Sequence, residues 1–399
     1  MNKIPVLVGI STIFFSILTI ISIIFPSLFS KLIGSYSQNL DEFEIGLFAI
    51  PVILSSIVLI GFGFLYYKNK LPGTIINGIN KIRSFEVSEK TTIVILLIIF
   101  GVYITLSTPE LSSDESIEWL DYRILDQALK IWPFGESENV YVQEQNDRYV
   151  RMFLLDASLK IFNNIKILPF IASIFVILFT YLLTAQITHK RFPGIIAILV
   201  LLQSNTFLTY DTVAVYENFW VLFYLISIYA IQKRWVLSPI FYGLSFFTKA
   251  FVAPNFIMTL YYVWQSQISK KKKLALLVSY TIVVSTLIVI IFSGETIYPD
   301  VVNVDFSKFF IGISSFAPLL RYDIFLILTL LPVVVGLTFM AKKSISHSDS
   351  ILFLILGTFL AGPILISFTN FYEILPYRFV PMIVFFAIGI GLFFQKKEN

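Results

Sequence analysis

Two adjacent carboxylates, Asp114 and Glu115, lie near the start of an acidic segment, residues 108–166, in a chain that is otherwise almost entirely apolar. This segment holds 11 Asp and Glu residues against 6 Lys and Arg. A carboxylate held beside a hydroxyl group can act as a general base. Asp114 and Glu115 are therefore candidate catalytic residues, placed a few residues past a predicted membrane helix. The alternative for both is helix capping, because a helix N-terminus favours carboxylates.

Four basic residues could bind an anion such as a phosphate: Lys249, Arg378, Arg148 and Arg151. Lys249 lies between two short apolar runs, where an ionisable group is a candidate for function; its alternative role is to extend to a membrane surface. The planar guanidinium of Arg378 suits a phosphate or a pair with Glu373. Arg148 and Arg151 are one helical turn apart, which suits an anion clamp or contact with lipid headgroups.

Two further acidic residues, Asp211 and Glu217, flank the turn YDTVAVYENF and could contact a substrate or cap the next helix. The chain has no cysteine, which excludes disulfides, thiolate metal sites and a cysteine nucleophile, and its two histidines argue against a histidine-based site. A divalent ion held by Asp114, Glu115 and Asp211 stays open as an alternative.

The composition indicates an integral membrane protein. Mean hydropathy is +0.84, 57% of the residues are hydrophobic and 14% are charged, whereas soluble domains have about 25% charged residues. A helix needs about 20 apolar residues to cross a bilayer, and the first run is expected to be a retained helix rather than a signal peptide. Twelve apolar runs predict spanning or half-spanning helices at 5–29, 43–67, 91–107, 167–188, 193–208, 217–232, 236–248, 252–267, 274–292, 320–341, 350–368 and 378–395.

Within the acidic segment, apolar residues recur at spacings of three and four over 116–132 and over 148–162. This spacing predicts two amphipathic helices. Trp119 and Trp132 suit a membrane interface, so we expect both helices to lie flat on the membrane surface. The predicted apolar face of the second helix consists of Val150, Phe153, Leu154, Ala157 and Ile161.

The distribution of charge predicts the orientation. If the N-terminus lies in the cytoplasm, the inner loops hold 18 basic and 4 acidic residues, and the outer side holds the remaining 11 basic and 21 acidic ones. Basic residues concentrate on the cytoplasmic side of membrane proteins. We therefore expect a multi-pass protein of the cell (plasma) membrane with both termini cytoplasmic and the segment 108–166 outside. The run of lysines at 270–273 is expected to anchor a helix end on anionic headgroups.

An acidic pair just after a membrane helix, two flat helices and a series of short helices resemble the GT-C glycosyltransferases. The resemblance is closest to the protein O-mannosyltransferase and aminoarabinose transferase branch. It covers about residues 90–270 and depends on the order of the matching parts. These are Asp114-Glu115, 148–162 running into 167–188, YDTVAVYENFWVLFYLISIYAIQKRW, and GLSFFTK at 243–249.

The resemblance implies an all-α polytopic membrane protein of GT-C type with about 12 transmembrane or half-membrane helices. It implies two N-terminal helices and a cytoplasmic linker at 1–90, a catalytic core at 91–292, and an outer loop with three helices at 293–399. The activity would be transfer of a sugar from a polyprenyl-phosphate donor to a lipid, glycan or protein acceptor on the outer face. Asp114 would be the base, and Glu115 would orient the acceptor or pair with a cation. The reaction would invert the anomeric centre with no cofactor and no metal.

Other functions stay open. A membrane transporter or lipid flippase would also be polytopic, but such proteins often carry internal repeats, and none is visible here. A polymerase or ligase of lipid-linked glycans would be expected to place its large outer loop late in the chain, not early. A non-catalytic protein of GT-C-like fold is the third alternative. Membrane lipids are expected partners in every case, and nucleic acid is not.

Overall fold

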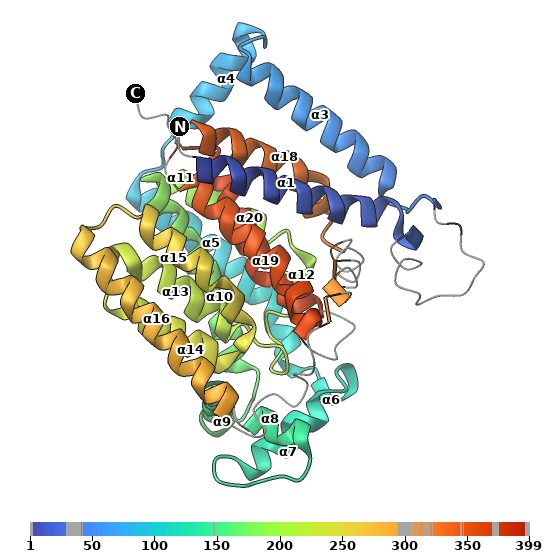
Figure 1. The fold of residues 1–399 in the computed structure, drawn as a ribbon, viewed down its shortest axis with the longest axis vertical. Helices are drawn as coiled ribbons and strands as arrows, with labels where there is room; N and C mark the ends of the chain where they lie inside the picture. The colour runs from blue at the N-terminus through green and yellow to red at the C-terminus, as the bar shows by residue number, and fades with distance from the viewer. Residues whose placement is uncertain are drawn as a thin grey trace. The chain divides into compact units, whose positions relative to one another are not determined.

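The computed structural model describes residues 3–28, 41, 43–146, 148–293, 305–306, 308–309, 312–313, 320, 322–343, 345, 347–368 and 375–395. These residues form helices joined by irregular segments (Figure 1), and no β-strand occurs among them. The predicted all-α class is confirmed.

Every predicted apolar run contains a helix, in two cases preceded by a 3-10 turn, and the run 193–208 is divided between α11 and the short helix α12 Asn205–Thr209. The correspondence follows from the sequence, since long apolar runs favour helix. The helices α18 and α19 continue through Pro332 and Pro363, as membrane helices can when neighbouring groups satisfy the freed backbone. The helices are α1 Lys3–Ile24, α3 Ala49–Tyr67, α5 Glu89–Ser107, α10 Ile167–Thr188, α11 Arg191–Leu201, α13 Phe219–Lys233, α14 Leu237–Thr248, η2 Ala250–Asn255 with α15 Phe256–Gln265, α16 Lys270–Ser293, α18 Ile324–Lys342, α19 Ser348–Phe368, and η3 Pro376–Phe379 with α20 Val380–Leu392.

Six stretches of the described chain are long and apolar enough to cross a membrane. They are Ile4–Ile24, Ala49–Tyr67, Glu89–Ser112, Ile167–Thr188, Ile324–Lys342 and Ser348–Phe368. Four further apolar helices are shorter, with 10–17 residues each. The chain is therefore a multi-pass helical membrane protein. The count of twelve crossings and the GT-C arrangement stay predictions.

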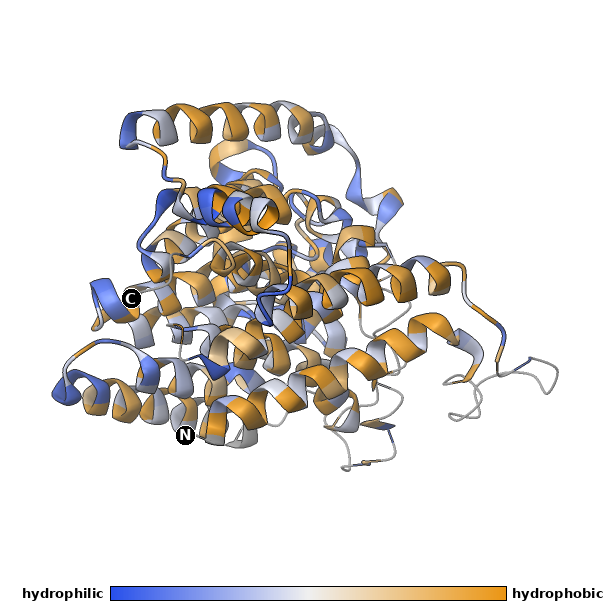
Figure 2. Cartoon of the chain, turned by 90° about the horizontal axis from the view of Figure 1, so that it is seen from above, coloured by the Kyte–Doolittle hydropathy of each residue, from blue (hydrophilic) through white to orange (hydrophobic). Residues whose placement is uncertain are grey.

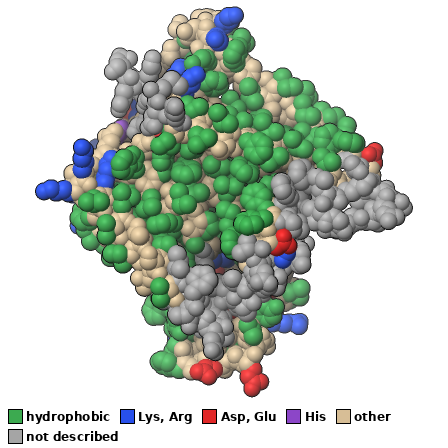
Figure 3. Space-filling view, viewed as in Figure 1, with side chains coloured by type: hydrophobic (Ala, Val, Ile, Leu, Met, Phe, Trp, Pro, Cys, Tyr) green, Lys and Arg blue, Asp and Glu red, His purple; other side chains and the backbone are tan. Residues whose placement is uncertain are grey.

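One compact unit consists of Met1–Thr92, Thr180–Thr206 and Asn303–Asn399. Within this unit, α1 packs against α18 and α19, α3 packs against α18, and α11 packs against α20. Gly9 allows the close approach of α1 and α18, because a Cβ at this position would lie 2.4 Å from the side chain of Thr338. Broad apolar surfaces remain exposed on α1 and α3 (Figure 3), as expected of helices that face lipid.

The same unit contains a helix that the sequence did not predict. Residues 68–90 were expected to form a cytoplasmic linker, but Gly73–Ser84 form α4. None of its residues is buried, and Lys81 and Arg83 lie in its last turn. The helix was missed because its apolar residues are few and are interrupted by glycine and asparagine.

The second compact unit consists of Ile93–Phe179 and Phe207–Val302. Here α13 packs against α14, and both α14 and α15 pack against α16. Polar side chains inside this bundle bond to one another, as when Tyr280 lies 2.6 Å from Ser227 and 2.8 Å from Ser238 through their hydroxyl oxygens. Hydrophobic residues run along the helices, and hydrophilic ones gather at helix ends and connections (Figure 2).

The acidic segment folds into η1 Thr108–Ser112, α6 Glu115–Glu118, α7 Tyr122–Ile131, α8 Val140–Asn146 and α9 Tyr149–Phe162. The single helix predicted over 116–132 is wrong, because the chain is extended at Trp119, with φ −126° and ψ 114°. The Trp119 ring packs 5.5 Å from the ring of Tyr210 and 5.1 Å from that of Tyr216, measured between centroids. This packing outweighs continuation of the helix.

The second predicted helix, 148–162, is confirmed as α9, but its apolar stripe does not face the protein interior. The buried residues of α9 are Arg151, Met152, Leu155 and Ser158. On the predicted apolar face, Phe153 is 60% exposed and Ile161 is 70% exposed. That stripe is therefore available to lipid, while the opposite face carries the protein contacts.

Candidate functional site

A buried irregular loop, residues 210–218, lies at the centre of the candidate site. It connects α12 Asn205–Thr209 to α13, and every one of its residues is buried. Buried backbone outside regular structure needs polar partners elsewhere in the protein. Here the partners come from the acidic segment and from α10, where the hydroxyl of Ser173 donates to the carbonyl of Asp211 at 2.7 Å.

Glu115 holds the middle of this loop. Its carboxylate accepts the backbone N–H of Ala214 at 2.6 Å and that of Val215 at 3.2 Å. The ammonium of Lys166 lies 3.9 Å from the same carboxylate. Burial raises the pKa of the Glu115 carboxyl, and the two amides and Lys166 oppose that rise. Glu115 is thus a buried anchor between α6 and the loop.

Arg151 holds the far end of the loop. Its Nε donates to Glu217 Oε2 at 2.8 Å, and both side chains are at most 3% exposed. Its Nη2 donates to the carbonyls of Val215 at 2.8 Å and Ala214 at 3.3 Å, and its Nη1 donates to Gln145. Nearly the whole guanidinium is therefore engaged within the protein.

The predicted anion clamp is accordingly already occupied by protein groups. Arg148 pairs with Glu144 on α8, and Arg151 pairs with Glu217. An incoming phosphate would have to displace a carboxylate from either arginine. The suggestion that Glu217 caps α13 is wrong, since Asn218 occupies the N-cap position and Glu217 faces Arg151.

Asp114 differs from Glu115 in its exposure to solvent. It is exposed, and one carboxylate oxygen accepts the backbone N–H of Ser116 at 2.9 Å, which makes it the N-cap of α6. The hydrogen bonds from Ser116 lower the pKa of its carboxyl, so the group is ionised at neutral pH. The capping interpretation is confirmed for Asp114, whereas its role as a base stays a prediction.

Asp211 is the second unusual carboxylate. Its Oδ2 accepts the hydroxyl of Ser107 at 2.9 Å. Its Oδ1 is buried and has no hydrogen-bond partner among the described residues. Burial raises the pKa of this carboxyl to about 7, against the lowering effect of the Tyr103 and Ser107 hydroxyls. Groups with such values are frequent at functional sites.

Lys249 is buried, with 9% of its surface exposed, at the C-terminus of α14. Its ammonium lies 5.8 Å from the centroid of the Trp220 ring, near enough for a cation–π contact. The side chain therefore stays within its unit rather than extending to the surface. The loop 210–218 leads directly into the helix that carries Trp220.

Arg378 belongs to the other compact unit, in η3. Its Nε donates to the hydroxyl of Tyr377 at 3.2 Å, and its guanidinium carbon lies 5.6 Å from that ring's centroid. Its suggested partner Glu373 lies outside the described residues. The joint role of Arg378 and Lys249 stays a prediction.

Lys166 was missed by sequence reasoning. Its ammonium donates to the carbonyl of Glu110 at 3.0 Å and to the hydroxyl of Ser113 at 2.7 Å, so it connects the residues just before Asp114 to the start of α10. The available signal was its position as a single cation between an acidic segment and an apolar run. Among the described residues, no group of three or more His, Asp or Glu is arranged to hold a metal ion.

The assembled site is a buried loop with one exposed carboxylate at its rim. No family model, curated protein or solved structure matches this chain. Chemically, the arrangement offers an ionised acceptor of protons at Asp114, a second carboxyl at Asp211 that titrates near neutrality, and a buried cation at Lys249.

Replacing Asp211 with Asn is expected to weaken the dependence of stability on pH. The folded protein keeps the Asp211 proton up to about pH 7, whereas the unfolded chain releases it near 3.8. The free energy of unfolding should therefore fall by on the order of 4 kcal/mol as the pH rises between these two values, and it should stay constant above about pH 7. Melting temperatures in detergent from pH 4 to 8 measure this, with Glu118→Gln, at an exposed carboxylate, as control. Equal pH slopes for wild type and Asp211→Asn would contradict the expectation.

Proposed function

We propose that this protein is a membrane glycosyltransferase that moves a sugar from a polyprenyl-phosphate donor to an acceptor hydroxyl on the outer membrane face. The observation that carries the proposal is that the two carboxylates of the acidic pair differ in burial. Glu115 is buried and anchored by Ala214 and Val215, and Asp114 is exposed beside it with one oxygen fixed by Ser116. An accessible carboxylate on a rigid support suits a general base.

In the proposed reaction, the acceptor oxygen attacks the anomeric carbon as Asp114 takes the hydroxyl proton. The bond between that carbon and the phosphate oxygen breaks, and polyprenyl phosphate leaves with inversion of configuration. Fixed cations are needed where the phosphate charge develops. Lys249 is the favoured cation because it is buried in the same unit as Asp114, and Arg378 is the second. Asp211 and Glu217 are assigned to substrate contact and loop support, respectively.

The fold type, the number of membrane helices and the topology are part of this proposal. We infer a GT-C type arrangement with about twelve transmembrane or half-membrane helices, both termini in the cytoplasm and the site outside the cell membrane. The exposed apolar stripe of α9, with Phe153 and Ile161, supports a surface helix that touches lipid. We propose that residues 91–292 form the catalytic core, with residues 1–90 and 293–399 as the flanking parts of the enzyme.

The direct test uses purified protein in proteoliposomes with polyprenyl-phosphate-linked sugars carrying a radioactive label. Time-dependent transfer or release of the label supports a glycosyltransferase. Label that crosses the membrane still attached to its lipid would support a transporter or flippase instead. Binding of the donor with neither outcome would support a non-catalytic protein of this fold.

Replacing Lys249 with Ala is expected to impair use of the donor without unfolding the protein. Loss of one charge-assisted contact to the leaving phosphate should lower kcat/KM for the donor by about tenfold. Initial rates over a range of donor concentrations measure the effect, and the exposed Lys160→Ala is the control. Misassembly of Lys249→Ala, seen by gel filtration, would show that Lys249 has a structural role.

A further inference from the structure

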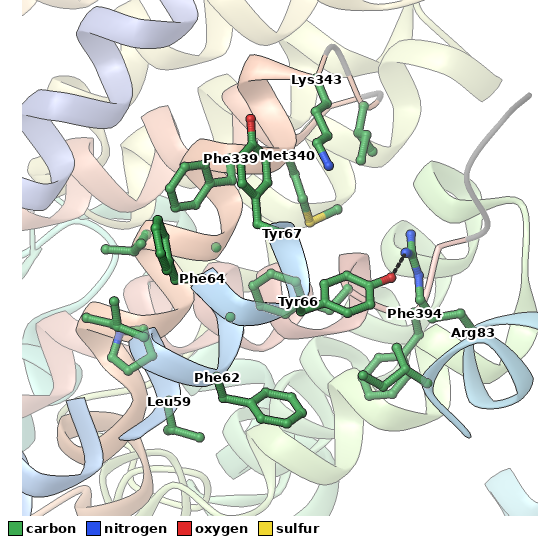
Figure 4. Close-up of a pocket in the computed structure, with 18 of the residues that line it drawn as sticks. Leu59, Phe62, Phe64, Tyr66, Tyr67, Arg83, Phe339, Met340, Lys343 and Phe394 are labelled. Carbon is green, nitrogen blue, oxygen red and sulfur yellow. Dashed lines mark hydrogen bonds between the residues drawn. The ribbon is translucent and has the colours of Figure 1, made fainter. Parts of the chain in front are cut away.

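A cavity of about 440 Å³ lies in the unit that contains both chain ends, and none of the residues of the candidate site lines it. Its walls come from α3, α4, the second half of α18 and the residues that follow α20 (Figure 4). The volume falls within the range of about 300–1,000 Å³ found for small-molecule sites. Nothing in the proposed glycosyl transfer uses this cavity.

Most of the wall is apolar, and part of it is open to the outside. Leu59, Phe62 and Phe64 line it from α3, opposite Pro332 and Phe339 of α18. Phe62 is 42% exposed and Phe64 is 50% exposed. Because α3 is a candidate membrane span, this opening faces the region where lipid chains lie. The apolar part of the cavity can therefore take up a hydrocarbon chain directly from the bilayer.

Two cations, Arg83 and Lys343, define one end of the cavity. Arg83 donates to the hydroxyl of Tyr66 at 3.1 Å and to the carbonyl of Gln395 at 2.8 Å. The ammonium of Lys343 lies 4.5 Å from the centroid of the Tyr67 ring. No carboxylate of the described chain forms an ion pair with either cation. A negatively charged group would therefore meet two uncompensated charges there.

The apolar and cationic parts are arranged along one direction. Tyr67 ends α3, and its ring lies 4.9 Å from that of Phe339 near the end of α18, so both helices end beside the cations. Leu59 lies seven residues before Tyr66, about 10 Å along the helix. A fitting ligand thus carries an anionic head and a long apolar tail.

We propose that this cavity binds one anionic phospholipid, with its phosphate beside Arg83 and Lys343 and one acyl chain along α3 and α18. A soluble phosphate compound would leave the apolar wall unused, and a neutral apolar molecule would leave both cations uncompensated. The basic residues around this end, such as Lys68 and Lys81, add to the attraction for anionic headgroups. The inference does not depend on the proposed enzymatic activity.

The chain offers two matched pairs of variants. Gly63 lines the cavity and Gly61 does not, and a Cβ atom added at either position would meet no other atom within 4 Å. Gly63→Leu should therefore fill the cavity without a clash, and Gly61→Leu is its control. Lys343 lines the cavity whereas its neighbour Lys342 does not, so Lys343→Gln and Lys342→Gln form the second pair.

The experiment measures lipid retained by the detergent-purified full chain, using native mass spectrometry. Phosphatidylglycerol and phosphatidylcholine with identical acyl chains are the probes. Wild type is expected to bind one phosphatidylglycerol about tenfold more tightly than phosphatidylcholine. Lys343→Gln should bind the two lipids with nearly equal affinity, and Gly63→Leu should bind each lipid about tenfold more weakly than wild type does. The two control variants should behave as wild type.

Several results would overturn the proposal. They are equal affinity of wild type for the two lipids, unchanged binding by Gly63→Leu, and displacement of phosphatidylglycerol by an equal concentration of glycerol phosphate. The last result would identify a site for a free phosphate compound. Melting temperature and gel filtration check that each variant folds. The Gly63 variant tests binding of the acyl chain and the Lys343 variant tests binding of the phosphate. If one variant fails to fold, the other still decides the question.

Discussion

Asp114→Asn is expected to lower the rate of sugar transfer by about 10²–10⁴-fold while the protein stays folded. Asparagine caps a helix about as well as aspartate, so the bond from the Ser116 amide and the short helix α6 should persist. Only the ability to accept a proton is removed. The rate of label transfer from a polyprenyl-phosphate donor at saturating concentration measures the effect.

The matched control is Glu118→Gln, which neutralises another exposed carboxylate of the same short helix. It should retain the wild-type rate. Near-wild-type transfer by Asp114→Asn would remove this residue as the base. Asp211 would then be the next candidate, because its pKa of about 7 suits proton transfer at neutral pH. A loss of activity in Asp211→Asn alone would support that reassignment.

Arg151→Met is expected to destabilise the protein by about 3–5 kcal/mol, because it leaves the buried carboxylate of Glu217 without its cation. The side chains of this pair are 3% and 1% exposed. The substitution also removes the donors to the carbonyls of Ala214 and Val215. Unfolding in detergent, followed by the loss of helical signal with heat, measures the change.

Two further variants test whether the loss of stability comes from the unpaired buried charge of Glu217. Arg148→Met removes a more exposed pair, in which the side chains are 22% and 11% exposed, and should cost much less. The double variant Arg151→Met with Glu217→Leu should recover part of the lost stability, because no buried charge is left unpaired. If Arg151→Met instead folds as stably as wild type but loses affinity for the donor, the anion-clamp prediction for Arg151 is supported.

Helix positions were largely predictable, because they depend on local composition. The run at 167–188 and helix α10 agree at both ends, and α14 differs from its predicted run by one residue. The prediction failed where a tertiary contact overrode local preference. The helix predicted over 116–132 is broken because Trp119 packs against Tyr210 and Tyr216, residues more than ninety positions away in the chain.

The candidate site was predictable in composition but not in geometry. The sequence singled out four candidate carboxylates: Asp114, Glu115, Asp211 and Glu217. It could not reveal that Glu115 would accept two backbone amides of a distant loop, since such amides carry no signal in the residue types of Ala214 and Val215. Lys166 was missed for the same reason, because its partners at Glu110 and Ser113 are more than 50 positions away.

The sequence by itself determined that this chain is a helical multi-pass membrane protein with one concentrated acidic segment. Apolar runs and clustered charges are sufficient for this conclusion, because the preference of each segment for lipid or water depends on its own residues. Only the tertiary structure decided which member of the acidic pair is exposed, that Arg151 is committed to Glu217, and that α3 and α18 enclose a cavity with two cations at its end. Those features depend on contacts between distant residues, and no local pattern encodes them.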